Sequence, residues 1–363
     1  IAYSSSPGNS NILHALEHIA IEKGDQEVRR HWLEARMTVN PDDPDLLRAH
    51  AHLLAKMGDM EAERDVRRLE ALGLDTPADR SLLSGLRARA GSRSEALEAI
   101  EKALEEDPSQ SKDWLSYANL LFEENEHSKA LEAANKCLEI DRQCGDAWAL
   151  KAKILAPKTN RLKDALKSAI HAVALDAGGV ELILLKADLL LTEGSASAAE
   201  ESLHKALEKD MMNGELRARI ATRNLLDGRI SDAQKLLDET PVGIDHALLH
   251  VVEGRLHLAN ADRTRDGTGE TDVTLLSVAI SAFENALKLN RELGVAWLGM
   301  ARTNRLLKNI DAADEALARA GRLLPEDDPS VAAEAALLCL DKGDITAAAQ
   351  QIDIADIHGQ SPI

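Results

Sequence analysis

The sequence has few aromatic residues, few cysteines and no long apolar run, and each shortage excludes a class of protein. Phe, Trp and Tyr make up 2% of the 363 residues, so Ala and Leu must build most of the core, which favours closely packed helices. Three cysteines without a CxxC pair, Cys137, Cys144 and Cys339, cannot form a disulfide framework. No stretch of about 18 apolar residues is present to span a bilayer, and the first residues lack the features of a signal peptide.

Positive charge is also scarce, with 43 Lys and Arg against 62 Asp and Glu and a net charge of −19. This acidic balance repels phosphate backbones and anionic membrane surfaces, so we expect neither a nucleic-acid partner nor direct membrane insertion. The unpaired cysteines slightly favour the cytoplasm over the periplasm. Because the chain begins with Ile1 and not with Met, we expect it to lack its native N-terminus.

The main positive signal is a pattern that returns about every 34 residues. It is clearest in residues 91–125, where Ala96, Ile100, Ala103 and Pro108 belong to one helix and its end, and Trp114 opens the next helix together with Tyr117, Ala118 and Leu121. The same phase returns further along the chain at Ala130, Ala134 and Cys137, at Ala165, Ala169 and Ala172, at Ala199, Leu203 and Ala206, at Ala279, Phe283 and Ala286, and at Ala313, Leu317, Ala320 and Pro325.

These residues resemble the tetratricopeptide repeat family, whose units are helix-turn-helix pairs. The resemblance implies an all-α, right-handed superhelical solenoid over residues 10–358, between a leader at 1–9 and a tail at 359–363. Small residues let facing helices approach, and each pair buries its open apolar face on the next pair. We trace ten units that begin near Ser10, Pro44, Pro77, Ser111, Gly145, Val180, Gly214, Asp245, Gly294 and Asp328.

Several segments depart from the repeat. Glu17, Arg29 and Glu63 occupy positions that are normally small, so the opening units are divergent. Residues 261–272 are polar and contain glycine, which predicts a flexible loop inside the eighth unit. The last helix keeps Ile345, Ile352, Ile354 and Ile357 and has no polar capping helix after it, which favours either continuation of the array or self-association. The turns between paired helices carry Gly24, Gly58, Gly91, Gly194 and Gly228, which we expect in the left-handed conformation.

One motif allows a catalytic alternative. His14, Glu17 and His18 match H-x-x-E-H, a spacing that places two imidazoles on one helix face for zinc with a carboxylate as general base. A third ligand cannot be identified, and His246 and His250 repeat the spacing without the Glu. Phosphate-binding loops and nucleophile elbows are absent from the sequence, so we expect a noncatalytic protein without a cofactor.

The family resemblance implies that first helices line a concave groove in which a protein or peptide segment binds. The candidate lining residues are His14, His18, Arg48, His52, Lys56, Arg89, Lys112, Asn119, Lys153, Asp188, Arg302 and Arg305. Seven cations in the lining positions are balanced by seven acids, Glu22, Asp45, Glu123, Asp146, Glu181, Asp188 and Glu215, so the excess acid lies elsewhere. Family members that bind chaperone tails use a carboxylate clamp, but here Leu115, Leu150 and Leu184 stand at or near its positions.

The sequence therefore predicts a noncatalytic scaffold or adaptor that binds a protein segment in its groove. Two alternatives remain open at this point: the chain is the repeat region of a larger enzyme or of an export or assembly machine, or it is a zinc-dependent hydrolase that uses His14, Glu17 and His18.

Overall fold

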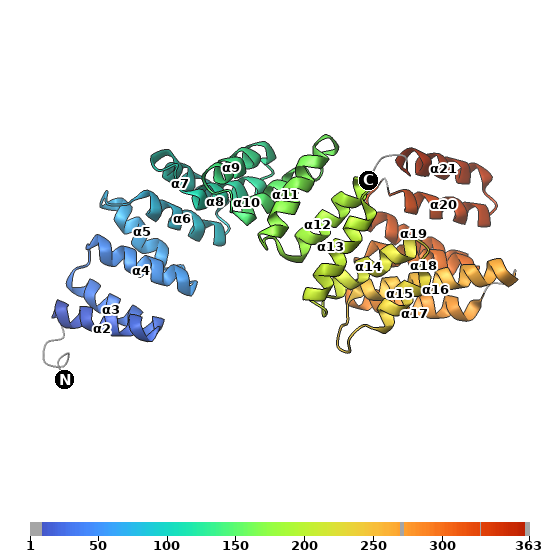
Figure 1. The fold of residues 1–363 in the computed structure, drawn as a ribbon, viewed down its shortest axis with the longest axis horizontal. Coiled ribbons are helices and arrows are strands. Elements are labelled where there is room, and N and C mark those ends of the chain that lie inside the picture. The colour runs from blue at the N-terminus through green and yellow to red at the C-terminus, as the bar shows by residue number, and fades with distance from the viewer. Residues whose placement is uncertain (1–8, 269–271, 327, 360–363) are drawn as a thin grey trace. The chain divides into compact units, whose positions relative to one another are not determined.

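The computed structural model describes residues 9–268, 272–326 and 328–359. Within these ranges the chain forms twenty α-helices and one short 3-10 helix, and no strand occurs. The helices alternate as first and second members of antiparallel pairs, so the fold is an all-α repeat solenoid (Figure 1). None of these helices combines the length and the apolar character that crossing a membrane requires.

The first helices of the ten pairs begin close to the starts of the predicted units. They are α2 (Ser10–Lys23), α4 (Pro44–Met57), α6 (Pro77–Arg89), α8 (Ser111–Glu123), α10 (Gly145–Leu155), α12 (Gly179–Thr192), α14 (Gly214–Leu226), α16 (Ala247–Thr268), α18 (Gly294–Leu306) and α20 (Pro329–Asp341). The second helices are α3 (Gln26–Val39), α5 (Ala62–Ala71), α7 (Arg93–Glu106), α9 (His127–Ile140), α11 (Leu162–Ala174, preceded by the 3-10 turn Thr159–Arg161), α13 (Ala196–Lys209), α15 (Ile230–Asp238), α17 (Val273–Leu289), α19 (Ile310–Leu323) and α21 (Ile345–Gly359).

The chain divides into two compact units, Ile1–Leu182 and Ile183–Ile363, which we call unit 1 and unit 2. Within unit 1, α4 packs against α6, α6 against α8 and α8 against α10. Within unit 2, the same relation joins α14, α16, α18 and α20 in turn. Successive first helices therefore stack side by side inside each unit, as nearest-neighbour burial of the pairs requires.

The repeated small residues occupy equivalent buried places. Ala96, Ala130 and Ala165 are each the fourth residue of a second helix, and each is 0% exposed. The tryptophans of the first helices also recur in one geometry, because each indole Nε1 donates to a backbone carbonyl six residues earlier. The distances are 2.8 Å from Trp114, 3.0 Å from Trp148 and 3.0 Å from Trp297. The sequence period thus corresponds to a repeated three-dimensional contact.

A buried phenylalanine shows why some of the small positions must be glycine. Phe283 in α17 is 0% exposed and lies between α16 and α18. A Cβ atom added at Gly254 would lie 2.6 Å from the ring, and one added at Gly299 would lie 2.3 Å from it. Such distances are shorter than any non-bonded carbon contact, so both glycines allow the helices to close around the ring.

The glycines at the turns adopt the left-handed conformation that the sequence predicts. Gly24 and Gly58, with φ of 69° and 79°, end α2 and α4, and their backbone N–H groups donate to carbonyls of the last helical turn. Gly91, Gly194 and Gly228 have φ of 82°, 88° and 73°. A residue with a Cβ atom is strained in this conformation, so glycine is the favoured residue at these helix ends.

The flexible loop predicted for residues 261–272 is wrong over most of its length. Residues 261–268 are the last turns of α16, while residues 269–271 lie outside the described ranges. Ala261 is buried in the cluster around Phe283, and Asp262 pairs with Arg265 one turn later at 3.4 Å. The buried alanine and the i,i+3 ion pair stabilise a helix here. Neither contact can be recognised from the polar composition on which the predicted loop was based.

The charged residues at small positions of the opening units are explained by ion pairs. Glu17 is 6% exposed, accepts a hydrogen bond from Arg36 and forms an ion pair with Arg29 at 3.7 Å, and both arginines lie on α3. Glu63 pairs with Arg67 at 2.7 Å and with Arg87 of α6 at 3.4 Å. These helices therefore associate through buried or half-buried charges where other pairs use alanine.

Candidate protein-binding surface

Several charged side chains of the first helices pair with a residue about one repeat away. Arg48 of α4 donates to Asp79 of α6 at 3.0 Å, and Asp79 is only 1% exposed. Arg305 of α18 donates to Glu334 of α20 at 2.5 Å and also contacts Asp341 at 3.4 Å. Both arginines therefore join successive pairs. These two predicted lining residues therefore form contacts between repeats of the solenoid.

Other predicted lining residues are partly engaged in the same way. Lys153 contacts Glu181 at 3.2 Å, Asp188 contacts Arg219 at 3.5 Å, and Arg302 contacts Asp262 at 2.8 Å. Arg89 donates to the carbonyl of Ala55 at 3.2 Å, and His18 lies 3.6 Å from Glu22 on its own helix. These ion pairs are more exposed than those of Arg48 and Arg305, and such pairs contribute little to stability.

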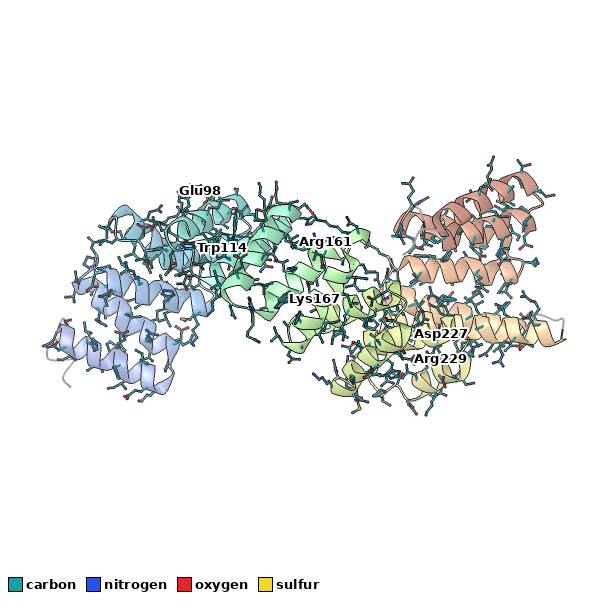
Figure 2. The ribbon with its side chains drawn as sticks, turned by 45° about the horizontal axis from the view of Figure 1, so that its top comes forward. Glu98, Trp114, Arg161, Lys167, Asp227 and Arg229 are labelled. Carbon is teal, nitrogen blue, oxygen red and sulfur yellow. The ribbon has the colours of Figure 1, made fainter. Side chains whose placement is uncertain are left out.

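The turns carry inter-repeat pairs as well. Arg229, at the start of α15, contacts Glu200 of α13 at 2.9 Å and Asp227 at 3.2 Å. Asp227 and Arg229 lie close together at the turn between α14 and α15 (Figure 2). The sequence predicted neither the pairing at the turn nor its contact with the preceding repeat.

The remaining predicted lining residues project into solvent from unit 1. In the part of the chain that the structure describes, no hydrogen bond or ion pair engages their side chains, and all five are exposed: His14, His52, Lys56, Lys112 and Asn119. They are available to a ligand. However, an exposed single charge is strongly hydrated and screened by salt, so each contributes weakly to affinity.

Unit 2 contains an apolar pocket between α12, α13 and α14. Its volume is about 90 Å³, enough for a branched aliphatic side chain. Leu184, Leu191 and Leu203 form part of its wall, and Leu226 stands at its edge with 73% of its surface exposed. A largely exposed leucine beside an apolar hollow is unusual for a surface that meets only water.

A charged pair borders this pocket. Asp188 of α12 and Arg219 of α14 both line it and lie 3.5 Å apart. Burial raises the pKa of Asp188, and the charge of Arg219 acts in the opposite direction. Glu200, Thr222 and Arg223 also line the pocket, so it combines an apolar wall with polar groups of both signs. Such an arrangement can bind an apolar side chain and hydrogen-bond to the adjacent backbone.

Arg255 occupies a first-helix position equivalent to that of Arg302, and the sequence analysis did not include it. It follows Gly254 in α16 as Arg302 follows Ala301 in α18, and the two helices pack against each other. Burial and, to a smaller extent, the charge of Arg302 lower the pKa of Arg255, while Asp328 opposes the shift. A small residue followed by Arg recurs at this position of the first helix, and this pattern could have identified Arg255. It was missed because the predicted eighth unit begins two residues before the helix, so its positions were aligned two residues out of step with those of the other units.

Two further cavities are lined by basic side chains, some of which are paired within the chain. A hollow of about 440 Å³ in unit 1 is lined by Arg64, Arg67 and Arg68 of α5, but Arg67 pairs with Glu63 and Arg68 with Asp42. A cavity of about 220 Å³ in unit 2 contains His246, His250 and His257. There His250 already contacts Asp245 at 2.9 Å and Glu253 at 3.3 Å. The Nδ1 atoms of His246 and His257 are buried and have no hydrogen-bond partner among the described residues.

The zinc site considered from the sequence does not assemble. Glu17 is bound by Arg29 and Arg36, so its carboxylate is neutralised and turned toward α3, whereas His14 and His18 are exposed. Among the described residues, no group of three His, Cys, Asp or Glu side chains has the geometry to hold a metal ion. The alternative of a hydrolase centred on these three residues therefore has no geometric support.

Cys137 lies in the core. It is 0% exposed and packs with Leu138 and Ala147, and burial raises the pKa of its thiol to about 12, with a smaller contribution from a hydrogen bond with Cys144. A thiol with such a pKa stays protonated near neutral pH and is a poor nucleophile or metal ligand.

The predicted self-association surface is only partly described. In α21, Ile345 is 74% exposed and Ile352 is 45% exposed, whereas the side chains of Ile354 and Ile357 lie outside the described residues.

Comparison with known proteins agrees with the repeat pattern. A family model described as tetratricopeptide repeat matches residues 87–154. The structure of a monomeric mutant of IFIT1 with m7Gppp-AAAA is similar at 18% identity and a TM-score of 0.53, covering 87% of this chain and 78% of that one. A tetratricopeptide repeat protein from Parabacteroides merdae has 18% identity and a TM-score of 0.48, with 73% and 97% covered. None of the curated proteins matches the chain by sequence.

Proposed function

Since the chain belongs to the tetratricopeptide repeat family, we propose that it is a noncatalytic scaffold that binds an extended segment of another protein along the first helices of unit 2. The pocket between α12, α13 and α14 is the observation that carries this proposal. It presents an apolar wall, an exposed leucine and a charged pair on consecutive helices, and similar combinations bind the anchor residues of peptides.

The partner is a protein and not a nucleic acid. A net charge of −19 opposes approach of a phosphate backbone, and the exposed cations of the lining are too few to reverse it. The apolar part of the pocket wall is formed by leucine and alanine side chains, and no aromatic ring lines the pocket for a base to stack on. A short aliphatic side chain suits its volume and its chemistry.

Binding energy on such a surface comes from one buried anchor and from polar contacts along the segment. Burying a leucine or valine side chain in an apolar site contributes about 1.5–3 kcal/mol. Hydrogen bonds to the segment's backbone add to this value, while ordering of the segment opposes it. We therefore expect micromolar affinity for a single short peptide and tighter binding for a longer segment.

The test uses random dodecapeptides displayed on phage and selected on the immobilised protein. We expect enrichment of peptides that share an aliphatic residue. A fluorescein-labelled representative should bind the Leu226→Glu variant about tenfold more weakly, because contact of the aliphatic anchor with a carboxylate at the pocket edge removes part of the carboxylate's hydration.

Leu289→Glu provides the matched control, because Leu289 is 47% exposed at the end of the second helix α17 and does not line the pocket. Its affinity for the peptide should equal that of the wild type. If no peptide is enriched, or if both variants bind the peptide equally, the proposed function is wrong.

A further inference from the structure

Arg255 stands apart from the other arginines of this chain. In the described ranges, every other arginine that is not fully exposed has an ion pair or a hydrogen bond to a backbone carbonyl. Arg48 contacts Asp79, Arg217 donates to two carbonyls, and Arg305 contacts Glu334. The partly buried Arg255 has no such acceptor in this part of the chain.

We propose that Arg255, with Arg302 beside it on the next first helix, binds a carboxylate of an Asp or Glu side chain in the partner segment. This inference rests on the proposed function and specifies the chemistry of the segment. It assigns the guanidinium a directly contacting counterion, which none of the described residues supplies, because Asp328 acts on Arg255 without forming an ion pair with it.

The unpaired state of Arg255 is unfavourable without a ligand. A guanidinium stays charged in proteins and carries five N–H donors, and removing part of its hydration without an acceptor costs free energy. The nearby Arg302 adds like-charge repulsion. Asp262 compensates Arg302 at 2.8 Å and also contacts Arg265 at 3.4 Å, so its charge is already shared. An incoming carboxylate relieves both the missing hydrogen bonds and the repulsion.

A carboxylate is the group that fits this arrangement. The planar fork of an arginine accepts a carboxylate in a two-point hydrogen bond, and a second arginine within reach stabilises the same charge. The acidic exterior of the chain repels an acidic segment elsewhere. The acid is therefore directed to Arg255, which forms no ion pair with any described carboxylate, and this contact sets the register of the segment.

The distance between pocket and arginine predicts a spacing in the ligand. Neighbouring packed helices lie about 8–10 Å apart, and α16 follows α14 in the stack. An extended segment rises about 3.3 Å per residue. The acid should therefore stand about three residues from the aliphatic anchor.

The experiment repeats the dodecapeptide selection on the wild type, on Arg255→Gln and on Arg263→Gln. Arg263 is an exposed arginine of the same helix, outside this cluster, and serves as the charge-matched control. We expect the wild type and Arg263→Gln to enrich peptides that carry both the aliphatic residue and the acid. Arg255→Gln should keep the aliphatic preference and lose the acidic one.

A double-mutant cycle on one selected peptide then measures the contact directly. Replacing the peptide's acid by its amide should weaken binding to the wild type about tenfold or more, and should change binding to Arg255→Gln very little. Circular dichroism checks that the variants keep their helix content.

The outcomes separate the two proposals. Peptides that share an aliphatic anchor but no acid, or an acid whose effect is unchanged in Arg255→Gln, overturn the role of Arg255 and leave the scaffold function intact. Failure of the wild type to enrich any peptide overturns the proposed function and this inference together.

Discussion

Units 1 and 2 use the same first-helix positions and leave different chemistry exposed on them. In unit 1, Arg48 is held by Asp79 of the next pair, while Lys56 and Lys112 project into solvent. In unit 2, Arg305 is held by Glu334, but Arg255 forms no ion pair with any described residue, and an apolar pocket lies nearby in the stack. The comparison teaches that a lining charge supports the fold when the adjacent repeat supplies its partner, and is free for a ligand when it does not.

The largest expected effect concerns the paired arginines of both units. Arg305→Met and Arg48→Met should each lower the free energy of unfolding by about 3–5 kcal/mol, because each leaves a buried carboxylate without its counterion. Glu334 and Asp79 are 7% and 1% exposed, so water cannot replace the lost partner. Urea unfolding followed by circular dichroism measures the change. A loss below about 1 kcal/mol in either variant contradicts a structural role for that pair.

A second effect contrasts glycines of the two units. Gly299→Ala in unit 2 should destabilise by about 1–3 kcal/mol, since the new Cβ would lie 2.3 Å from the ring of Phe283. Gly85→Ala in unit 1 has no neighbour within 4 Å and should stabilise α6 by about 0.5–1 kcal/mol. Thermal unfolding compares the two variants, and a shift of the same sign in both would show that this packing argument is wrong.

Alkaline pH should affect unit 1 more than unit 2. Burial raises the pKa of Cys137 to about 12 and, with a hydrogen bond to Glu101, the pKa of Tyr117 to about 12. Both groups are neutral when protonated, and in the unfolded chain they ionise near 9.0 and 10.0. Their contribution to stability is therefore complete below pH 9 and is lost as the pH rises toward 12. Hydrogen exchange at increasing pH should show α8 and α9 opening before α16 to α18, and Cys137→Ala should reduce the difference.

The smallest effect is expected in the exposed lining of unit 1. Lys56→Ala and Lys112→Ala should change the free energy of unfolding by less than about 0.5 kcal/mol, because hydrated single charges contribute little. They should also leave the affinity for a selected dodecapeptide within about twofold. Fluorescence anisotropy provides the measurement. A tenfold loss of affinity would indicate that the peptide binds to unit 1 and not to unit 2.

The periodic part of the fold could be predicted from the sequence because it depends on residue size and glycine conformation. The helix pairs, the buried Ala96 and Ala130 and the left-handed Gly24 follow from local pattern and from contacts that every repeat shares. The predicted loop was wrong because Ala261 and Asp262 are stabilised by tertiary and i,i+3 contacts that composition does not reveal.

The candidate site was less predictable, because the partner of a charged side chain lies one repeat away. Arg48 and Arg305 look like the exposed Lys56 in the sequence, and only the positions of Asp79 and Glu334 show that the two arginines are engaged. The pocket depends on how α12, α13 and α14 pack, and Arg255 was hidden by a shift of two residues in the start of its unit. Solvent-facing residues such as Lys56 were identified because exposure follows directly from helical periodicity.

The central claim is that Arg255 binds a ligand and does not stabilise the fold. The urea unfolding midpoint of Arg255→Met tests this claim most directly. Replacing an unpaired, partly buried guanidinium by an apolar side chain of similar length removes its desolvation cost and its repulsion from Arg302. We predict a midpoint equal to or above that of the wild type. A decrease as large as that of Arg305→Met would contradict the account.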